Sequence, residues 1–341
     1  MNSSNSTFNN ASSVPYFPVE LKVTKLASAM RLFVYSNILP FVLSAGSFWN
    51  LLIIIYFVKI NIKNLKKMSS YHFLIINLAV ADLCTCFGTP ITLHFYLKPS
   101  WELGAFGCTF MSSFIFYICP MVSCWLLVLI SFARFWSIMY PLRARINKKK
   151  YGLACLSIWI ITSLSNVYYF ITNKIKQSQD GPRCWDASME GSDVVQPLIT
   201  IFLDSFLPFA IMLFLYHKME KRLNAEENEN SFALNDQSRQ RNRRALRTIR
   251  GLIWLFILTV ILGRVYNLLS RVLDFYKSNN KPPFLTMLDV FIWVSYSLNV
   301  LIYFMNNILN IFIYAKMIPD FRRFLLTVFT FGMYGKRNAI N

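Results

Sequence analysis

Long apolar runs alternate with short polar segments along the whole chain. A run of about 20 apolar residues in helical conformation is long enough to cross about 30 Å of hydrocarbon. Lipid cannot satisfy the backbone of an open strand, so such runs must be helices. We read seven of them, at residues 32–58, 69–94, 109–140, 151–170, 196–217, 245–270 and 284–315. The pattern predicts an all-α membrane protein with a seven-transmembrane helix bundle.

Composition supports a membrane protein over a soluble one. Apolar residues make up 55% of the 341 residues and charged residues 15%, whereas a soluble domain carries about 25% charged residues. This much apolar sequence also excludes an intrinsically disordered chain. The net charge of +19 is compatible with nucleic-acid binding until the positions of the charges are considered.

The basic residues predict the orientation of the bundle. Most of them lie in the segments 59–67, 134–150 and 218–250 and in the tail after residue 315. By the positive-inside rule these segments are cytoplasmic and the N-terminus is outside. The charge is thereby explained by topology and by contact with lipid headgroups, so we expect no nucleic-acid partner.

Three parts of the chain are expected from this topology. Residues 1–31 form an extracellular N-terminus, residues 32–317 the transmembrane domain, and residues 318–341 a cytoplasmic amphipathic eighth helix and tail. Sequons at Asn2, Asn5 and Asn10 predict that the N-terminus is glycosylated.

Short motifs occur in order along the predicted spans and loops. An acidic residue, Asp82, ends the run Asn77–Asp82 inside the second span, where a buried carboxylate is costly and usually functional. The other motifs are Trp101-Glu102-Leu103-Gly104 before Cys108, Arg134 before Pro141-Leu142, and Asn310 to Tyr314 before Asp320-Phe321-Arg322-Arg323-Phe324.

Together these motifs resemble those of the rhodopsin-like (class A) G-protein-coupled receptors, over about residues 32 to 330. The resemblance implies a plasma-membrane receptor that needs no cofactor. It implies an extracellular ligand, a heterotrimeric G protein and arrestin as partners. The sequence shows no catalytic nucleophile motif, phosphate loop or zinc motif, so we do not expect an enzyme. A light receptor is excluded because the span 284–315 has no lysine for a retinal Schiff base.

The resemblance also implies roles for individual residues. Cys108 and Cys184 would form a disulfide between the third span and the second outer loop. Arg134 would contact the G protein, joined by Tyr216 and Tyr314 in the active state. A polar cluster that holds a sodium ion in many members would consist of Asn50, Asp82, Ser123, Asn306, Asn307 and Asn310.

Several positions depart from the family pattern. The acid before the arginine is Ala133, and the position of a second acid on the sixth helix holds Asn242. We therefore expect Arg134 to lack both of these acid partners and the receptor to signal without ligand. The sixth-span Trp and Pro and a seventh-span Pro are replaced by Val260, Leu262 and Ile311. One extra residue separates Cys108 from Arg134, and Pro120 marks a bulge that absorbs it.

The ligand class is less determined. Asp204 and Arg264 are intramembrane charges that we expect to pair at ligand depth, either as a structural salt bridge or in contact with ligand. Tyr117 and Asn267 complete the expected pocket. An amine is disfavoured because residues 109–123 contain no acid. A peptide, as in neuropeptide receptors, is favoured by the acidic second outer loop. The alternatives are a lipid or other small molecule, or an ion-coupled transporter.

Overall fold

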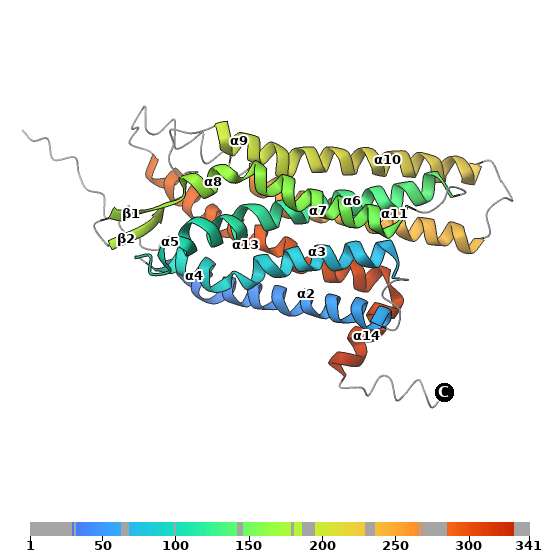
Figure 1. The fold of residues 1–341 in the computed structure, drawn as a ribbon, viewed down its shortest axis with the longest axis horizontal. Coiled ribbons are helices and arrows are strands. Elements are labelled where there is room, and N and C mark those ends of the chain that lie inside the picture. Colours follow the sequence, from blue (N-terminus) through green and yellow to red (C-terminus); the bar gives the residue numbers. More distant parts are fainter. Residues whose placement is uncertain are drawn as a thin grey trace, which may run out of the picture.

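The computed structural model describes residues 29–30, 32–62, 68–98, 100–141, 146–178, 181–185, 195–228, 236–265, 268 and 285–330. Long helices run side by side along the longest axis of the molecule, with a β-hairpin at one end and the helix α14 at the other (Figure 1). We call these the hairpin end and the α14 end.

Each of the seven predicted runs contains helix. The elements are η1 (Val34–Ile38) with α2 (Leu39–Asn61); α3 (Ser70–Phe87) with α4 (Thr89–Leu97); α5 (Gly104–Phe106), η3 (Gly107–Met111) and η4 (Phe114–Ile118) with α6 (Cys119–Met139); α7 (Lys148–Ser165) with α8 (Val167–Thr172); α9 (Val195–Ile201) and η6 (Phe202–Phe206) with α10 (Leu207–Asn228); α11 (Asp236–Phe256) with η7 (Ile257–Ile261); and α13 (Leu285–Met317).

Within the described residues, five stretches are by themselves long and apolar enough to cross a membrane. They are Val34–Asn61, Ser70–Phe87, Gly104–Met139, Leu198–Ala225 and Asn242–Val265. A sixth is obtained when Val300–Lys316 is joined to Pro319–Phe329 across a bend of 109°. The fourth predicted run is covered by α7, which begins with Lys148, Lys149 and Lys150 and is not among them.

The wide π-helical turns have a local cause. Three of them, η1, η4 and η6, end two residues before Pro40, Pro120 and Pro208 respectively. Proline lacks an N–H and its ring clashes with the carbonyl four residues earlier, so a wider turn relieves the contact. The turn η4 lies between Cys108 and Arg134, which confirms the bulge predicted from their spacing. The turns η3 and η7 have no proline two residues after their last residue, so this cause does not apply to them.

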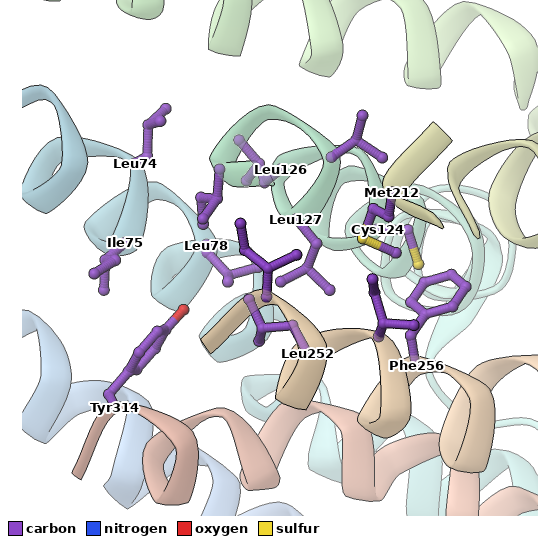
Figure 2. Close-up of a cluster of buried hydrophobic side chains, with 14 of the residues drawn as sticks. Leu74, Ile75, Leu78, Cys124, Leu126, Leu127, Met212, Leu252, Phe256 and Tyr314 are labelled. Carbon is purple, nitrogen blue, oxygen red and sulfur yellow. The ribbon is translucent and has the colours of Figure 1, made fainter. Parts of the chain in front are cut away.

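Figure 2 shows part of the main hydrophobic core, with labelled side chains from five of the helices that meet in it. The labelled residues are Leu74, Ile75 and Leu78 of α3, Cys124, Leu126 and Leu127 of α6, Met212 of α10, Leu252 and Phe256 of α11, and Tyr314 of α13. Burial of this apolar surface holds the helices in one arrangement and thereby fixes the polar residues between them.

The hairpin end carries a two-stranded antiparallel sheet that the sequence did not predict. Strand β1 (Lys174–Ser178) pairs with β2 (Gly181–Trp185), and Ile175 lies opposite Cys184. The Trp101 backbone N–H donates to the Pro182 carbonyl at 2.5 Å. The hairpin is therefore joined to the segment that leads into the third long helix.

The helix predicted after the seventh run is present as α14 (Pro319–Phe329). Phe321 is fully buried, and its ring centroid lies 4.9 Å from that of Tyr56. The Phe324 ring packs on Tyr56 at 5.1 Å, while Arg322 and Arg323 are exposed. The helix is thus amphipathic and rests on α2 through its aromatic face.

Candidate functional site

A disulfide closes the hairpin end. Cys108 of η3 and Cys184 of β2 are bonded, with Cα atoms 5.4 Å apart and a sequence separation of 76. The Trp101 indole N–H donates to the Gly104 carbonyl at 2.9 Å. Gly104 has φ +68°, a conformation that glycine adopts without steric cost. The tryptophan–glycine motif therefore builds the turn that leads to Cys108, and the predicted disulfide is confirmed.

Asp82 is the centre of a buried polar cluster in the middle of the bundle. Its carboxylate is fully buried and accepts a hydrogen bond from Ser123 Oγ at 2.6 Å. Asn310 Nδ2 donates to its second oxygen at 2.8 Å. Three of the predicted cluster members thereby join α3, α6 and α13, and no Lys or Arg of the described residues forms an ion pair with Asp82.

The other predicted members take different partners. Asn50 Nδ2 donates to the backbone carbonyls of Gly46 at 2.9 Å and Asn307 at 2.7 Å. Asn306 Oδ1 accepts from Thr259 Oγ1 at 3.2 Å and so faces the sixth helix. Asn307 therefore takes part through its backbone carbonyl, which binds Asn50. The Asn306 side chain forms a separate contact, which joins α13 to η7. Thr259 was not predicted to belong to this cluster.

The oxygens around Asp82 fit a hard cation. Asn50 Oδ1 and Asn310 Oδ1 are buried acceptors without a hydrogen-bond partner among the described residues. Carboxylate, amide and hydroxyl oxygens are the ligands that such cations prefer. A site of three or more His, Cys, Asp or Glu side chains is absent from the described part of the chain, so a transition-metal site has no support there.

A buried ion pair lies nearer the hairpin end. Arg264, just after η7, donates through one terminal nitrogen to Asp204 Oδ2 of η6 at 2.5 Å. The two side chains are 15% and 5% exposed respectively. Ser205 Oγ donates to the other Asp204 oxygen, and the Tyr303 ring of α13 lies 5.1 Å from the guanidinium carbon. The structure thus brings together the two charges that the sequence placed at similar depth.

The remaining pocket residues are placed in part. The Tyr117 ring stacks on Tyr169 of α8 with centroids 3.6 Å apart, and the Tyr169 hydroxyl lies 3.3 Å from Thr200 Oγ1 of α9. Tyr117 is thereby connected to the segment that precedes Asp204. Asn267 and the sequon residues Asn2, Asn5 and Asn10 lie outside the described residues.

Arg134, near the α14 end, stacks on an aromatic ring. Its guanidinium carbon lies 3.5 Å from the centroid of the Tyr71 ring of α3. Among the described residues Arg134 forms no ion pair with an acid, as expected, and a cation–π contact takes the place of the missing acid. Tyr216 donates to Glu220 Oε1 at 2.7 Å, and the buried Tyr314 hydroxyl has no partner among the described residues. No hydrogen bond of the described residues joins Arg134 to Tyr216 or Tyr314.

Residues 49–314, most of the chain, match the family model described as 7 transmembrane receptor (rhodopsin family). The chain belongs to this family. It is accordingly a multi-pass receptor of the plasma membrane and not an enzyme.

Curated relatives of this receptor share about a quarter of its residues over the aligned parts. Cysteinyl leukotriene receptor 1 of Sus scrofa is 27% identical over 191 residues, 54% of each chain. Probable G-protein coupled receptor 174 of Homo sapiens is 27% identical over 188 residues, 54% of this chain and 55% of its own. The N-arachidonyl glycine receptor of Rattus norvegicus is 28% identical over 119 residues, 34% of this chain and 36% of its own. The receptor spans about half the length of the first two relatives.

Two aromatic residues of the receptor site escaped the sequence reasoning. Tyr71 and Tyr303 each place a ring against an arginine that the sequence had singled out, Arg134 and Arg264 respectively. Neither stands in a motif, and an aromatic residue in a transmembrane helix is ordinarily part of the apolar core. Only the packing of α3 and α13 against the neighbouring helices reveals their role.

Proposed function

We propose that this receptor binds a ligand at its extracellular hairpin end and activates a heterotrimeric G protein at its cytoplasmic α14 end. The observation that supports this most is a polar stripe along one face of α13, formed by Tyr303, Asn306 and Asn310 at helical spacing. They contact Arg264, Thr259 and Asp82 respectively. The stripe connects the ion pair to the middle of the bundle.

Signalling then follows from a shift between two arrangements of the helices. A ligand that binds one arrangement more tightly raises its population by that difference in affinity. In the arrangement described here Arg134 lies on Tyr71. We propose that the G protein and arrestin bind an arrangement in which Arg134 has left Tyr71 and faces Tyr216 and Tyr314. The basic first turns of α11 would then contact lipid headgroups and the G protein.

A sodium ion at Asp82 is part of this proposal. The ion would be held by Asp82, Ser123, Asn50 and Asn310. Ser123 and Asn310 contact the buried Asp82 carboxylate, which has no ion-pair partner among the described residues, and Asn50 and Asn310 each offer a buried amide oxygen without a partner there. Its charge would offset the cost of burying that carboxylate. Binding of sodium would therefore favour the arrangement in which α3, α6 and α13 are joined through Asp82.

For the ligand we propose an amphiphilic lipid acid. The names of two relatives refer to a cysteinyl leukotriene and to N-arachidonyl glycine. An N-acyl glycine combines a long apolar chain with one carboxylate, for which Arg264 is a buried cation between apolar helices. A basic peptide is the second candidate, favoured by the acids at Asp180, Asp186, Glu190 and Asp193, which lie outside the described residues.

A ligand screen with a promiscuous G-protein reporter tests the proposal. Cells that express the receptor are exposed in parallel to N-acyl amino acids and to basic peptides, with the Arg134→Ala variant at matched surface expression as control. The proposal expects a response to N-acyl amino acids that Arg134→Ala abolishes. A response to basic peptides alone would assign the ligand to the second class, and a response that persists in Arg134→Ala would contradict the coupling role of Arg134.

A further inference from the structure

We infer that Arg264 is the binding residue for a ligand carboxylate and that Asp204 is its built-in competitor. This inference rests on the proposed function and names the chemistry by which the pocket selects its ligand. It starts from an imbalance of hydrogen-bond donors and acceptors around the buried ion pair.

The acceptor side of the pair is satisfied. One Asp204 oxygen accepts from Ser205 and the other from Arg264. The donor side is not. Arg264 Nε and the Tyr303 hydroxyl are both buried and have no hydrogen-bond partner among the described residues.

Buried donors without partners are costly, and a surplus of them beside a cation indicates a place for an acceptor. A guanidinium has five N–H groups in a planar fork, and Asp204 takes only a terminal one. A carboxylate on the Nε side would accept from Nε and, with its second oxygen, from the Tyr303 hydroxyl. Such a charge-assisted contact is stronger than one between neutral groups.

Two carboxylates on one guanidinium repel each other. The ligand carboxylate therefore weakens the hold of Asp204 on Arg264 and takes over part of the charge. Asp204 keeps its hydrogen bond from Ser205 on the same turn of η6. The ion pair between η6 and the sixth helix therefore weakens when the acid binds, so the ligand would favour an arrangement of these helices different from the one described here.

Tyr303 links ligand binding at Arg264 to the other polar residues on the same face of α13. Tyr303 lies one helical turn before Asn306, whose side chain bonds Thr259 of η7. A ligand that engages the Tyr303 hydroxyl thus acts on the same helix face that carries the contact to Asp82. Binding at Arg264 and the arrangement of the polar stripe are coupled through this face.

The charge of the ligand decides how each substitution in the ion pair changes ligand affinity. If the ligand is an acid, removal of the Asp204 charge frees Arg264 and tightens binding, whereas removal of the Arg264 charge abolishes it. If the ligand is a cation, the two substitutions have the opposite effects. If the pair is only structural, both substitutions destabilise the fold and neither creates selectivity for an anion.

The test uses sodium acetate as the probe and thermal unfolding of the purified full chain in lipid nanodiscs as the readout. Sodium chloride at equal concentration controls for salt, and acetamide controls for size without charge. Asp204→Asn should gain about 2–4 °C at an acetate concentration of about ten times its Kd, with no gain from acetamide. Arg264→Gln should not respond to acetate.

Tyr303→Phe in the Asp204→Asn background should weaken acetate binding several-fold, because the hydroxyl donor is lost. If Asp204→Asn does not fold, wild type is compared with Ser205→Ala, which removes the hydrogen bond that Asp204 keeps on releasing Arg264. Ser205→Ala should bind acetate several-fold more weakly than wild type. Acetate shifts that equal those of chloride in Asp204→Asn would overturn the inference, as would acetate binding by Ser205→Ala as tight as that by wild type. An acetate shift in Arg264→Gln equal to that in Asp204→Asn would also overturn it. No G protein takes part in this assay, so its failure is distinct from failure of the proposed coupling, which nucleotide exchange measures.

Discussion

Replacing Tyr71 with leucine should raise ligand-independent signalling. The Tyr71 ring lies 3.5 Å from the Arg134 guanidinium carbon, and neither Ala133 nor Asn242 supplies a carboxylate to that arginine. A partly buried cation–π contact contributes about 1–2 kcal/mol. Its loss weakens only the arrangement in which Arg134 lies on Tyr71, so a minor active population should rise about fivefold to thirtyfold.

Basal GTP-analogue uptake by a co-reconstituted heterotrimeric G protein measures this population. Tyr71→Phe keeps the ring and should stay close to wild type. Phe73→Leu is a matched control on the same helix, because the Phe73 ring faces Lys148 at 5.6 Å. Equal basal uptake by wild type and Tyr71→Leu, at equal receptor amounts, would refute the reasoning that this contact restrains Arg134.

Four further outcomes are expected. Ala133→Asp should lower basal uptake by giving Arg134 a neighbouring carboxylate, and unchanged uptake would count against that pairing. Asp82→Asn should abolish the rise in melting temperature that sodium chloride gives over choline chloride, and a retained sodium effect would place the ion elsewhere. Cys184→Ser should lose about 4 kcal/mol of stability, and with it most surface expression, because the loop closed by the disulfide is long; flow cytometry checks this. Phe321→Ala should cost about 3 kcal/mol and increase hydrogen exchange in α14, and unchanged exchange would show that the Phe321 ring does not hold α14 on α2.

The sequence was sufficient for features that depend on local pattern or on charge. Apolar run lengths located the helices, and the resemblance to the receptor family implied the Cys108–Cys184 disulfide. The pairing of Asp204 with Arg264 was also predictable, because either charge alone inside a membrane is too costly to remain unpaired. The extra residue before Pro120 was enough to predict a wider turn, which the structure shows as η4.

The features that the sequence did not show depend on packing between helices. Tyr71 and Tyr303 acquire their roles only because α3 and α13 turn those rings toward an arginine. Asn306 matched the polar cluster by position, yet its side chain bonds Thr259 because that threonine faces it across η7 and α13. The β-hairpin also went unpredicted, because its strands are short and alternate poorly between apolar and polar residues.

Nucleotide exchange by the purified receptor tests the central claim most directly. Wild type and Tyr71→Leu are placed in lipid nanodiscs with a panel of heterotrimeric G proteins, and uptake of a GTP analogue is followed over time. For at least one G protein, uptake with wild type should be faster than with empty nanodiscs, and uptake with Tyr71→Leu should be faster still. Uptake with Arg134→Ala, prepared in the same way, should equal that with empty nanodiscs. Uptake that matches empty nanodiscs for both wild type and Tyr71→Leu across the whole panel would contradict the central claim.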